Sequence, residues 1–126
     1  MKTLIYVVML MLSIQAFAKS DGVLRPQFPG GEKALAQYLD THLKYPEEAQ
    51  KQKYQGQSLV AFTVNEDGSL TNVRILKSSH LVLDTEALRI IKNMPKWSPA
   101  QNNGAPKKEM VVLPITFDLN KKNIQY

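Results

Sequence analysis

The stretch Met110–Leu119 constrains the fold more than any other part of this chain. Its odd-numbered residues are all apolar and would share one face of an extended strand: Val111, Leu113, Ile115, Phe117 and Leu119. This alternation is typical of a half-buried β-strand. Pro114 lies in its middle, and proline has no N–H, so within a sheet it is confined to edge strands or bulges. Because the amides of a strand point alternately to its two neighbours, we expect Pro114 to face a side without a neighbour.

An edge strand at the end of the chain has a functional implication. Its outer row of N–H and C=O groups can pair with another extended chain, which is how several peptide-recognition domains bind. Pairing of two copies of this strand would give a homodimer by the same means, so both a foreign strand and a second copy are candidate partners.

The N-terminus has the composition of an export signal. Lys2 precedes the apolar run Leu4–Ile14, and Ala16-Phe17-Ala18 supplies small residues at the spacing of a cleavage site. The run is shorter than the roughly 20 apolar residues of a membrane span. We therefore expect residues 1–18 to be a signal peptide removed on export. The alternative is an uncleaved anchor that tethers the domain to the inner membrane.

The remaining chain predicts one small domain. Residues 19–29 read as an extended arm, held by Pro26 and Pro29, and residues 121–126 as a polar tail. Between them, periodicity and turn residues predict in order a helix after Gly30-Gly31, a short helix from Pro46, strands Gln57–Asn65 and Leu70–Lys77, a helix capped by Asp84, an irregular segment Lys96–Lys108 and the last strand.

The two middle strands form a predicted hairpin. Matching their apolar faces puts Val60 opposite Ile75 and Val64 opposite Thr71, with a turn containing Asp67-Gly68. Together the elements predict the α+β class, as a two-layer sandwich. Its three-stranded antiparallel sheet is packed by two main helices and has the C-terminal strand at its edge.

Composition argues against several function classes. The 126 residues include no cysteine, which excludes disulfides and thiolate metal sites. Without Lys2, fifteen Lys and Arg face eleven Asp and Glu, a net charge of +4. These charges are scattered and interleaved, without the basic stripe that nucleic-acid binding favours, so a solvated surface is the better interpretation.

The polar residues do not assemble into an active site in the sequence. Ser79, His80 and Asp84 lie close together, but triad members usually meet from distant positions, and no nucleophile elbow accompanies them. A small secreted hydrolase using these three residues is therefore the weakest alternative. The two histidines, His42 and His80, lack the spacing of a metal motif, so we expect no enzyme activity, no metal and no cofactor.

The order of short motifs resembles the C-terminal domain of TonB proteins. The motifs that carry the resemblance are Phe28-Pro29-Gly30-Gly31, Tyr45-Pro46 with Ala49, Gly56, Phe62-Thr63-Val64, Asp67-Gly68, Lys77-Ser78-Ser79, Leu83-Asp84 with Ala87-Leu88, Trp97-Ser98-Pro99-Ala100, Gly104 with Pro106, and Leu113-Pro114-Ile115-Thr116-Phe117. The resemblance runs from about Gln27 to Leu119, so residues 30–120 are expected to be a TonB C-terminal-like domain. His80 stands where the family usually has glycine.

TonB proteins are energy transducers of Gram-negative bacteria, in which this domain grips the N-terminal box of an outer-membrane transporter as an added strand. The resemblance therefore implies a periplasmic domain in TonB-dependent transport, whose partner is such a transporter or another envelope protein. It implies that Val111–Leu119 is the receiving edge, with Val112, Thr116 and Asp118 as backbone donors. The implied partner-binding residues are Val112, Leu113, Pro114, Ile115, Thr116, Phe117 and Asp118.

The family's Pro-rich spacer has no counterpart between Ala18 and Gln27, where extended chain reaches only about 30 Å. A membrane-anchored minimal transducer, with the signal uncleaved, is the alternative.

Overall fold

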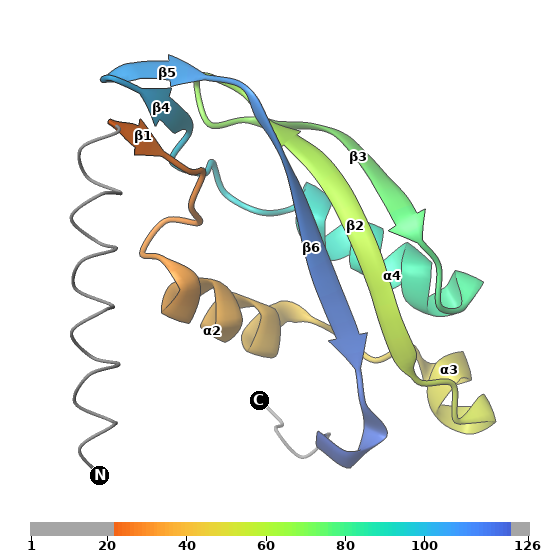
Figure 1. Cartoon of the computed structure of the whole chain (residues 1–126). Helices are drawn as coiled ribbons and strands as arrows, with labels where there is room; N and C mark the ends of the chain where they lie inside the picture. The colour runs from red at the N-terminus through yellow and green to blue at the C-terminus, as the bar shows by residue number, and fades with distance from the viewer. Residues whose placement is uncertain (1–21, 122–126) are drawn as a thin grey trace, which may run out of the picture.

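The computed structural model describes residues 22–121, whose centre is a three-stranded antiparallel sheet. Strand β2 (Gly56–Val64) lies between β3 (Leu70–Lys77) and β6 (Glu109–Phe117), in the order β3-β2-β6 (Figure 1). Burial alternates along β6, as the apolar pattern predicts, whereas the central strand β2 buries Val60, Ala61 and Phe62 in succession. The predictions of an α+β fold and of a C-terminal strand at the sheet edge are confirmed.

The hairpin between β2 and β3 departs from the predicted register in its turn-proximal half. Val60 pairs with Ile75 as predicted, but Val64 pairs with Leu70 instead of Thr71. The pairing shifts twice along β3, and Asn72 adopts a positive φ of 54° at one of these places. An extra residue in one strand displaces all pairs beyond it by one position, which explains the discrepancy.

The turn of this hairpin is fixed to a distant loop. Gly68 has a φ of 89°, and its carbonyl accepts a hydrogen bond from the Trp97 N–H at 2.9 Å. A Cβ at position 68 would lie 2.3 Å from the Trp97 carbonyl oxygen, so this turn requires glycine for space as well as for conformation. Trp97 itself packs edge-on against Phe62 in the core.

Three helices, α2 (Glu32–His42), α3 (Glu47–Gln52) and α4 (Leu81–Lys92), form the second layer. In Figure 1, α4 lies behind the sheet, α3 lies beside the lower end of β2, and α2 lies past the β6 edge. The core between the layers contains Phe62, Ile90, Ile91 and Ile115 among its fully buried side chains. The two long helices differ in depth: six residues of α4 are buried, whereas α2 has none.

Helix α4 begins earlier than the sequence predicted. Its first residue is Leu81 and its N-cap is His80, whose side chain makes no capping hydrogen bond. Asp84 is therefore inside the first turn, and the prediction that it caps the helix was wrong. The Asp84 carboxylate instead accepts hydrogen bonds from side chains outside the helix, described below.

A second, small sheet joins the arm to the segment that was predicted to be irregular. It consists of β1 (Val23–Leu24), β4 (Ala100–Asn102) and β5 (Ala105–Lys107), in the order β1-β4-β5. Below β1, Gln27 and Ser98 exchange two backbone hydrogen bonds of 3.0 and 2.8 Å. The arm is extended, and it is held by pairing that the sequence did not predict.

The predicted signal peptide and the part of the tail after position 121 lie outside the described residues. Within residues 22–121, no helix combines the length and apolar character needed to cross a bilayer. The described chain ends in a short 3-10 turn, Leu119–Lys121.

Candidate functional site

The outer side of β6 is the candidate site. β6 pairs with β2 on one side through nine residue pairs in unbroken register, and no described strand pairs with its other side. The register continues through Pro114, opposite Leu59. This is expected if position 114 faces the free side, since a proline facing β2 would remove a ladder bond. By the same alternation, the amides of Val112 and Thr116 face the free side.

The two faces of β6 differ in burial. On the inner face, Ile115 and Phe117 are 1% and 2% exposed, while Val111 and Leu113 are only half-buried. The outer face is open: Met110 is 50% and Val112 40% exposed. The core contact of β6 is therefore tight at its C-terminal end and looser toward its N-terminal end.

Side-chain contacts tie the outer face of β6 to the other two strands. Gln57 Nε2 donates to Thr116 Oγ1 at 3.1 Å, and Arg74 Nη2 of β3 lies 3.2 Å from Met110 Sδ. The Arg74 side chain therefore passes over β2, where the small side chain of the fully buried Ala61 leaves room for it. These contacts involve side chains on the outer face of β6. They do not use the backbone N–H and C=O groups on its free edge.

Both ends of the edge are marked by polar contacts. At the start of β6, Arg25 Nε of the arm lies 3.3 Å from Glu109 Oε2. Past its end, the Leu119 N–H donates to Gln55 Oε1 at 2.8 Å, and the Asn120 N–H donates to Asp118 Oδ1 at 2.9 Å. The candidate edge is therefore bounded at about residues 110 and 118. Sequence reasoning missed Arg25 and Gln55, because neither has a local pattern that indicates its distant partner.

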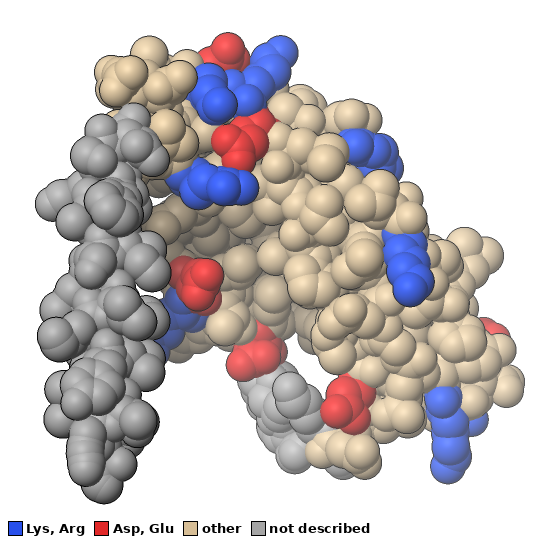
Figure 2. All heavy atoms as spheres, in the orientation of Figure 1, with Lys and Arg blue, Asp and Glu red and all other residues tan. Residues whose placement is uncertain are grey.

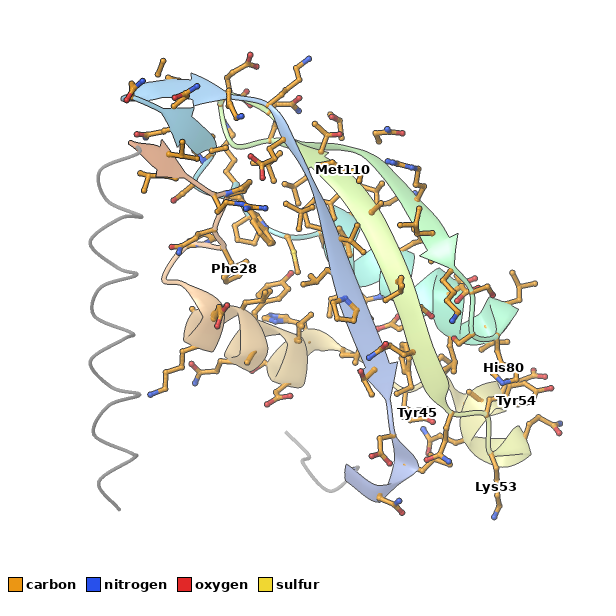
Figure 3. The ribbon with its side chains drawn as sticks, viewed as in Figure 1. Phe28, Tyr45, Lys53, Tyr54, His80 and Met110 are labelled. Atoms are coloured by element: carbon orange, nitrogen blue, oxygen red, sulfur yellow. The ribbon has the colours of Figure 1, made fainter. Side chains whose placement is uncertain are left out.

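The C-terminal end of β6 is packed by an aromatic side chain from the loop after α2. Tyr45 meets Phe117 edge-on, with ring centroids 5.6 Å apart, and its hydroxyl donates to the Tyr54 carbonyl (Figure 3). Burial raises the pKa of the Tyr45 phenol, and the nearby Asp118 carboxylate raises it further. Tyr45 is therefore a protonated hydrogen-bond donor at neutral pH, in a structural role.

The predicted triad residues are only partly brought together. Ser79 donates to Asp84 from its backbone N–H, at 3.1 Å, and its hydroxyl lies 3.4 Å from the same Oδ1. His80, which would have to bridge serine and aspartate, instead stacks on Tyr54 at a centroid distance of 4.2 Å and 6° between planes (Figure 3). The arrangement lacks the order of groups that activates a serine.

Asp84 is the centre of a buried polar cluster. It is 6% exposed and also accepts hydrogen bonds from Ser78 Oγ and, at 2.7 Å, from Ser58 Oγ of β2. Burial acts to raise the pKa of the carboxyl, but the hydrogen bonds from Ser78, Ser58 and Ser79 outweigh it and hold the pKa below its ordinary value. The cluster joins the end of β3 and the start of α4 to the central strand.

A groove of about 750 Å³ lies between the loop after α2 and helix α4. Two of its charged side chains, Glu86 and Arg89, are paired with each other. Arg89 binds both carboxylate oxygens of Glu86 at 2.8 Å, and the Lys44 N–H donates to Glu86 Oε2 at 2.7 Å. Among the described residues, no group of three or more His, Asp or Glu side chains could hold a metal ion.

Comparisons with known proteins point in one direction. Residues 41–119 match the family described as Gram-negative bacterial TonB protein C-terminal. Over 79 residues, 62% of this chain, the sequence is 33% identical to Protein TonB of Helicobacter pylori strains J99 and 26695. The match spans about a quarter of the length of those relatives, 27% and 26% respectively.

Two solved structures share the fold. Both are NMR solution structures of the Helicobacter pylori TonB-CTD, each 26% identical in sequence to this chain. One has a TM-score of 0.52, over 66% of this chain and 75% of that one. The other, shorter one has a TM-score of 0.55, over 71% and 95%.

Proposed function

This chain belongs to the family of TonB C-terminal domains, and on that premise we propose that it binds an extended segment of another envelope protein as an added strand on β6. The partner is the N-terminal segment of an outer-membrane transporter, or another envelope protein that presents an extended segment. The domain acts in TonB-dependent transport by holding this segment and performs no covalent chemistry.

One observation carries the proposal: β6 is a regular nine-residue strand that has a partner on one side only within the described structure. Backbone hydrogen bonds to such an edge give affinity with little dependence on side-chain identity. The receiving residues are those from Val112 to Asp118. On the free side, Val112, Thr116 and Asp118 supply the donors, since Pro114 has none.

The protein is proposed to lie in the periplasm after removal of residues 1–18. The mature chain would then begin with the arm, residues 19–29, which is followed by the domain, residues 30–120. Retention of the N-terminal segment would make the protein a membrane-anchored minimal transducer. Mass spectrometry of the native protein distinguishes the two, because cleavage after Ala18 gives a chain that begins at Lys19.

The experiment is an NMR titration of isotope-labelled domain with peptides from transporter N-termini. We expect the largest amide shifts from Val111 to Leu119. Thr116→Pro removes one free-side donor and should weaken binding about 3- to 10-fold, the effect of one hydrogen bond. Thr116→Ala is the matched control, because it changes the same side chain and keeps the N–H.

Shifts confined to the helices, or equal affinities of the Thr116→Pro and Thr116→Ala variants, would contradict strand addition on β6. Self-pairing of two β6 edges competes for the same groups. Sedimentation without peptide measures it, and a homodimer dissociated by peptide would assign both partners to this edge.

A further inference from the structure

Helix α2 presents an apolar stripe that the described part of the chain, residues 22–121, covers incompletely. Leu35, Tyr38 and Leu39 pack against the core, yet each remains partly exposed, and no residue of α2 is buried. Helix α4, in the same layer, buries six residues. Because the stripe is apolar and α2 extends past the sheet edge in Figure 1, the second layer reaches beyond the sheet that should cover it.

The residues that flank α2 pack near opposite ends of the paired β2–β6 strands. Before α2 starts, Phe28 contacts Trp97, which contacts Phe62, the β2 residue paired with Val111. After α2 ends, Tyr45 contacts Phe117. Figure 3 shows Phe28 beside the start of the helix and Tyr45 near the end of the strand. Eleven helical residues span about 16 Å, close to the roughly 20 Å of strand from Val111 to Phe117.

The gap is widest toward the start of β6. Val111 and Leu113 are half-buried, whereas Ile115 and Phe117 are almost fully buried. Figure 2 shows the surface hollowed on the free side of β6, between the arm and α2. The Phe28 ring, which precedes α2, lies 5.2 Å from the Tyr38 ring of the helix.

A strand added to β6 would place every second side chain over this gap. Residues directly opposite Val111, Leu113 and Ile115 share their face, and in such pairs the Cβ atoms lie about 4.5–5.5 Å apart. The intervening side chains would point to the open outer face. The side chains of the added strand would therefore alternate, with one set facing α2 and the other facing solvent.

We propose that α2 selects the incoming segment: the strand that binds β6 carries apolar side chains at alternate positions, and these side chains contact Leu35, Tyr38 and Leu39. This inference rests on the proposed function and specifies its partner chemistry. Backbone pairing on β6 supplies the position of the strand, and α2 supplies the preference for its sequence. The occupant completes the core that α2 leaves open.

Two eight-residue peptides of equal composition test the selection. One carries four valines at alternate positions, and the other carries the same valines consecutively, with serine and threonine elsewhere. We expect the alternating peptide to bind about tenfold more tightly, from burial of two side chains that the other peptide leaves partly in water. Isotope-filtered NOEs should join its valine methyl groups to the Leu35 methyl groups.

A charge swap tests the same contact from the protein side. Leu35→Lys should lower the affinity for the alternating peptide about tenfold. The same variant should bind more tightly than wild type to a peptide in which one inward-facing valine is replaced by glutamate. The matched control is Ala36→Lys, on the exposed side of the same helix, and should change either affinity less than about twofold. If Leu35→Lys loses its core methyl resonances, Leu35→Ala replaces it, with an expected loss of about threefold.

The two hypotheses fail differently. If both peptides shift the β6 amides equally and Leu35→Lys behaves as Ala36→Lys does, selection by α2 is wrong and strand addition stands. If no peptide shifts the β6 amides, the proposed function is wrong. A preference for the alternating peptide without NOEs to Leu35 would also overturn the role of α2.

Discussion

The two edges of the principal sheet differ in their fitness to receive another strand. The β3 edge loses register with β2 twice, and Asn72 adopts a left-handed conformation there. Arg74 Nη1 donates to the Asn72 carbonyl at 2.9 Å, so one acceptor of this strand is already used. The β6 edge keeps nine pairs in register, and its one interruption is Pro114, which removes a donor and leaves the register unbroken.

The comparison shows two degrees of edge protection within one sheet. The register shifts of β3 disrupt regular pairing at two places and increase the local twist, whereas the proline of β6 removes one donor at one place. The first device suits an edge that must stay unpaired. The second suits an edge that must bind reversibly, since it lowers the affinity of self-pairing while it retains other donors.

The largest effect is expected from the Asp84 cluster, which anchors the end of β3. Asp84→Asn should lower the free energy of unfolding by about 1–3 kcal/mol, because buried serine hydroxyls lose a charged acceptor. Peptide affinity of β6 should stay within about twofold if the two edges are independent. Chemical denaturation and peptide titration of the same variant measure both, with Asp40→Asn on the exposed side of α2 as control.

The same carboxylate predicts a pH dependence. Its pKa is lower in the folded than in the unfolded state, so its contribution to stability is complete above the unfolded pKa of about 4. The contribution is lost as the pH falls through the folded pKa. The stability difference between wild type and Asp84→Asn should therefore shrink on acidification below pH 4, and a constant difference would contradict the assignment.

Asn72 offers a way to remove the difference between the edges. Asn72→Val should destabilise the fold by about 1–2 kcal/mol, since a β-branched residue is poorly tolerated at positive φ. Asn72→Gly keeps the conformation and should be close to neutral. Amide shifts on β3 upon peptide addition to Asn72→Val would mean that the bulge alone had kept this edge unpaired.

Pro114 tests the weaker protection of β6. Pro114→Thr restores a donor on the free side, so peptides should bind up to about tenfold more tightly, the equivalent of 0.5–1.5 kcal/mol for one hydrogen bond. Sedimentation should also detect stronger self-association. Pro106→Thr, in the small sheet, is the control and should change neither property. Unchanged affinity of Pro114→Thr would show that position 114 does not face the partner.

The smallest effect is expected at the Arg25–Glu109 ion pair, which marks the start of the β6 edge. The Arg25 side chain is 79% exposed, and such pairs contribute within about 0.5 kcal/mol. Arg25→Ala should therefore leave the denaturation midpoint almost unchanged, as should Arg25→Gln. A larger loss would mean that the arm supports β6 and that the comparison of two independent edges is too simple.

Patterns with short-range causes were predictable from the sequence. The alternation of Val111 through Phe117 gave the strand and its inner face, and Pro114 gave its place at the edge. The pairing of Val60 with Ile75 followed from matched apolar faces. These features depend on period and on backbone chemistry, which a single sequence contains.

Features with long-range causes were not predictable. The strands β4 and β5 have three residues each, too few for a period; they pair with each other, and β4 also pairs with β1 from the distant arm. Asp84 looks like a helix cap locally, but serines from β2 and from the β3–α4 turn determine its role. The uncovered stripe of α2 has the same apolar spacing as a buried one, so only the packed structure separates the two.

The small sheet also determines how the molecule would respond to tension. The arm is held by two β1–β4 pairs and the Gln27–Ser98 bridge, whereas nine pairs join β6 to β2. A pull on Gly22, opposed by a strand bound to β6, would put the same force on both sets of bonds and should break the smaller set first. The arm would then separate from the domain and lengthen the connection to Gly22 by about 20 Å, while β6 stays paired with β2.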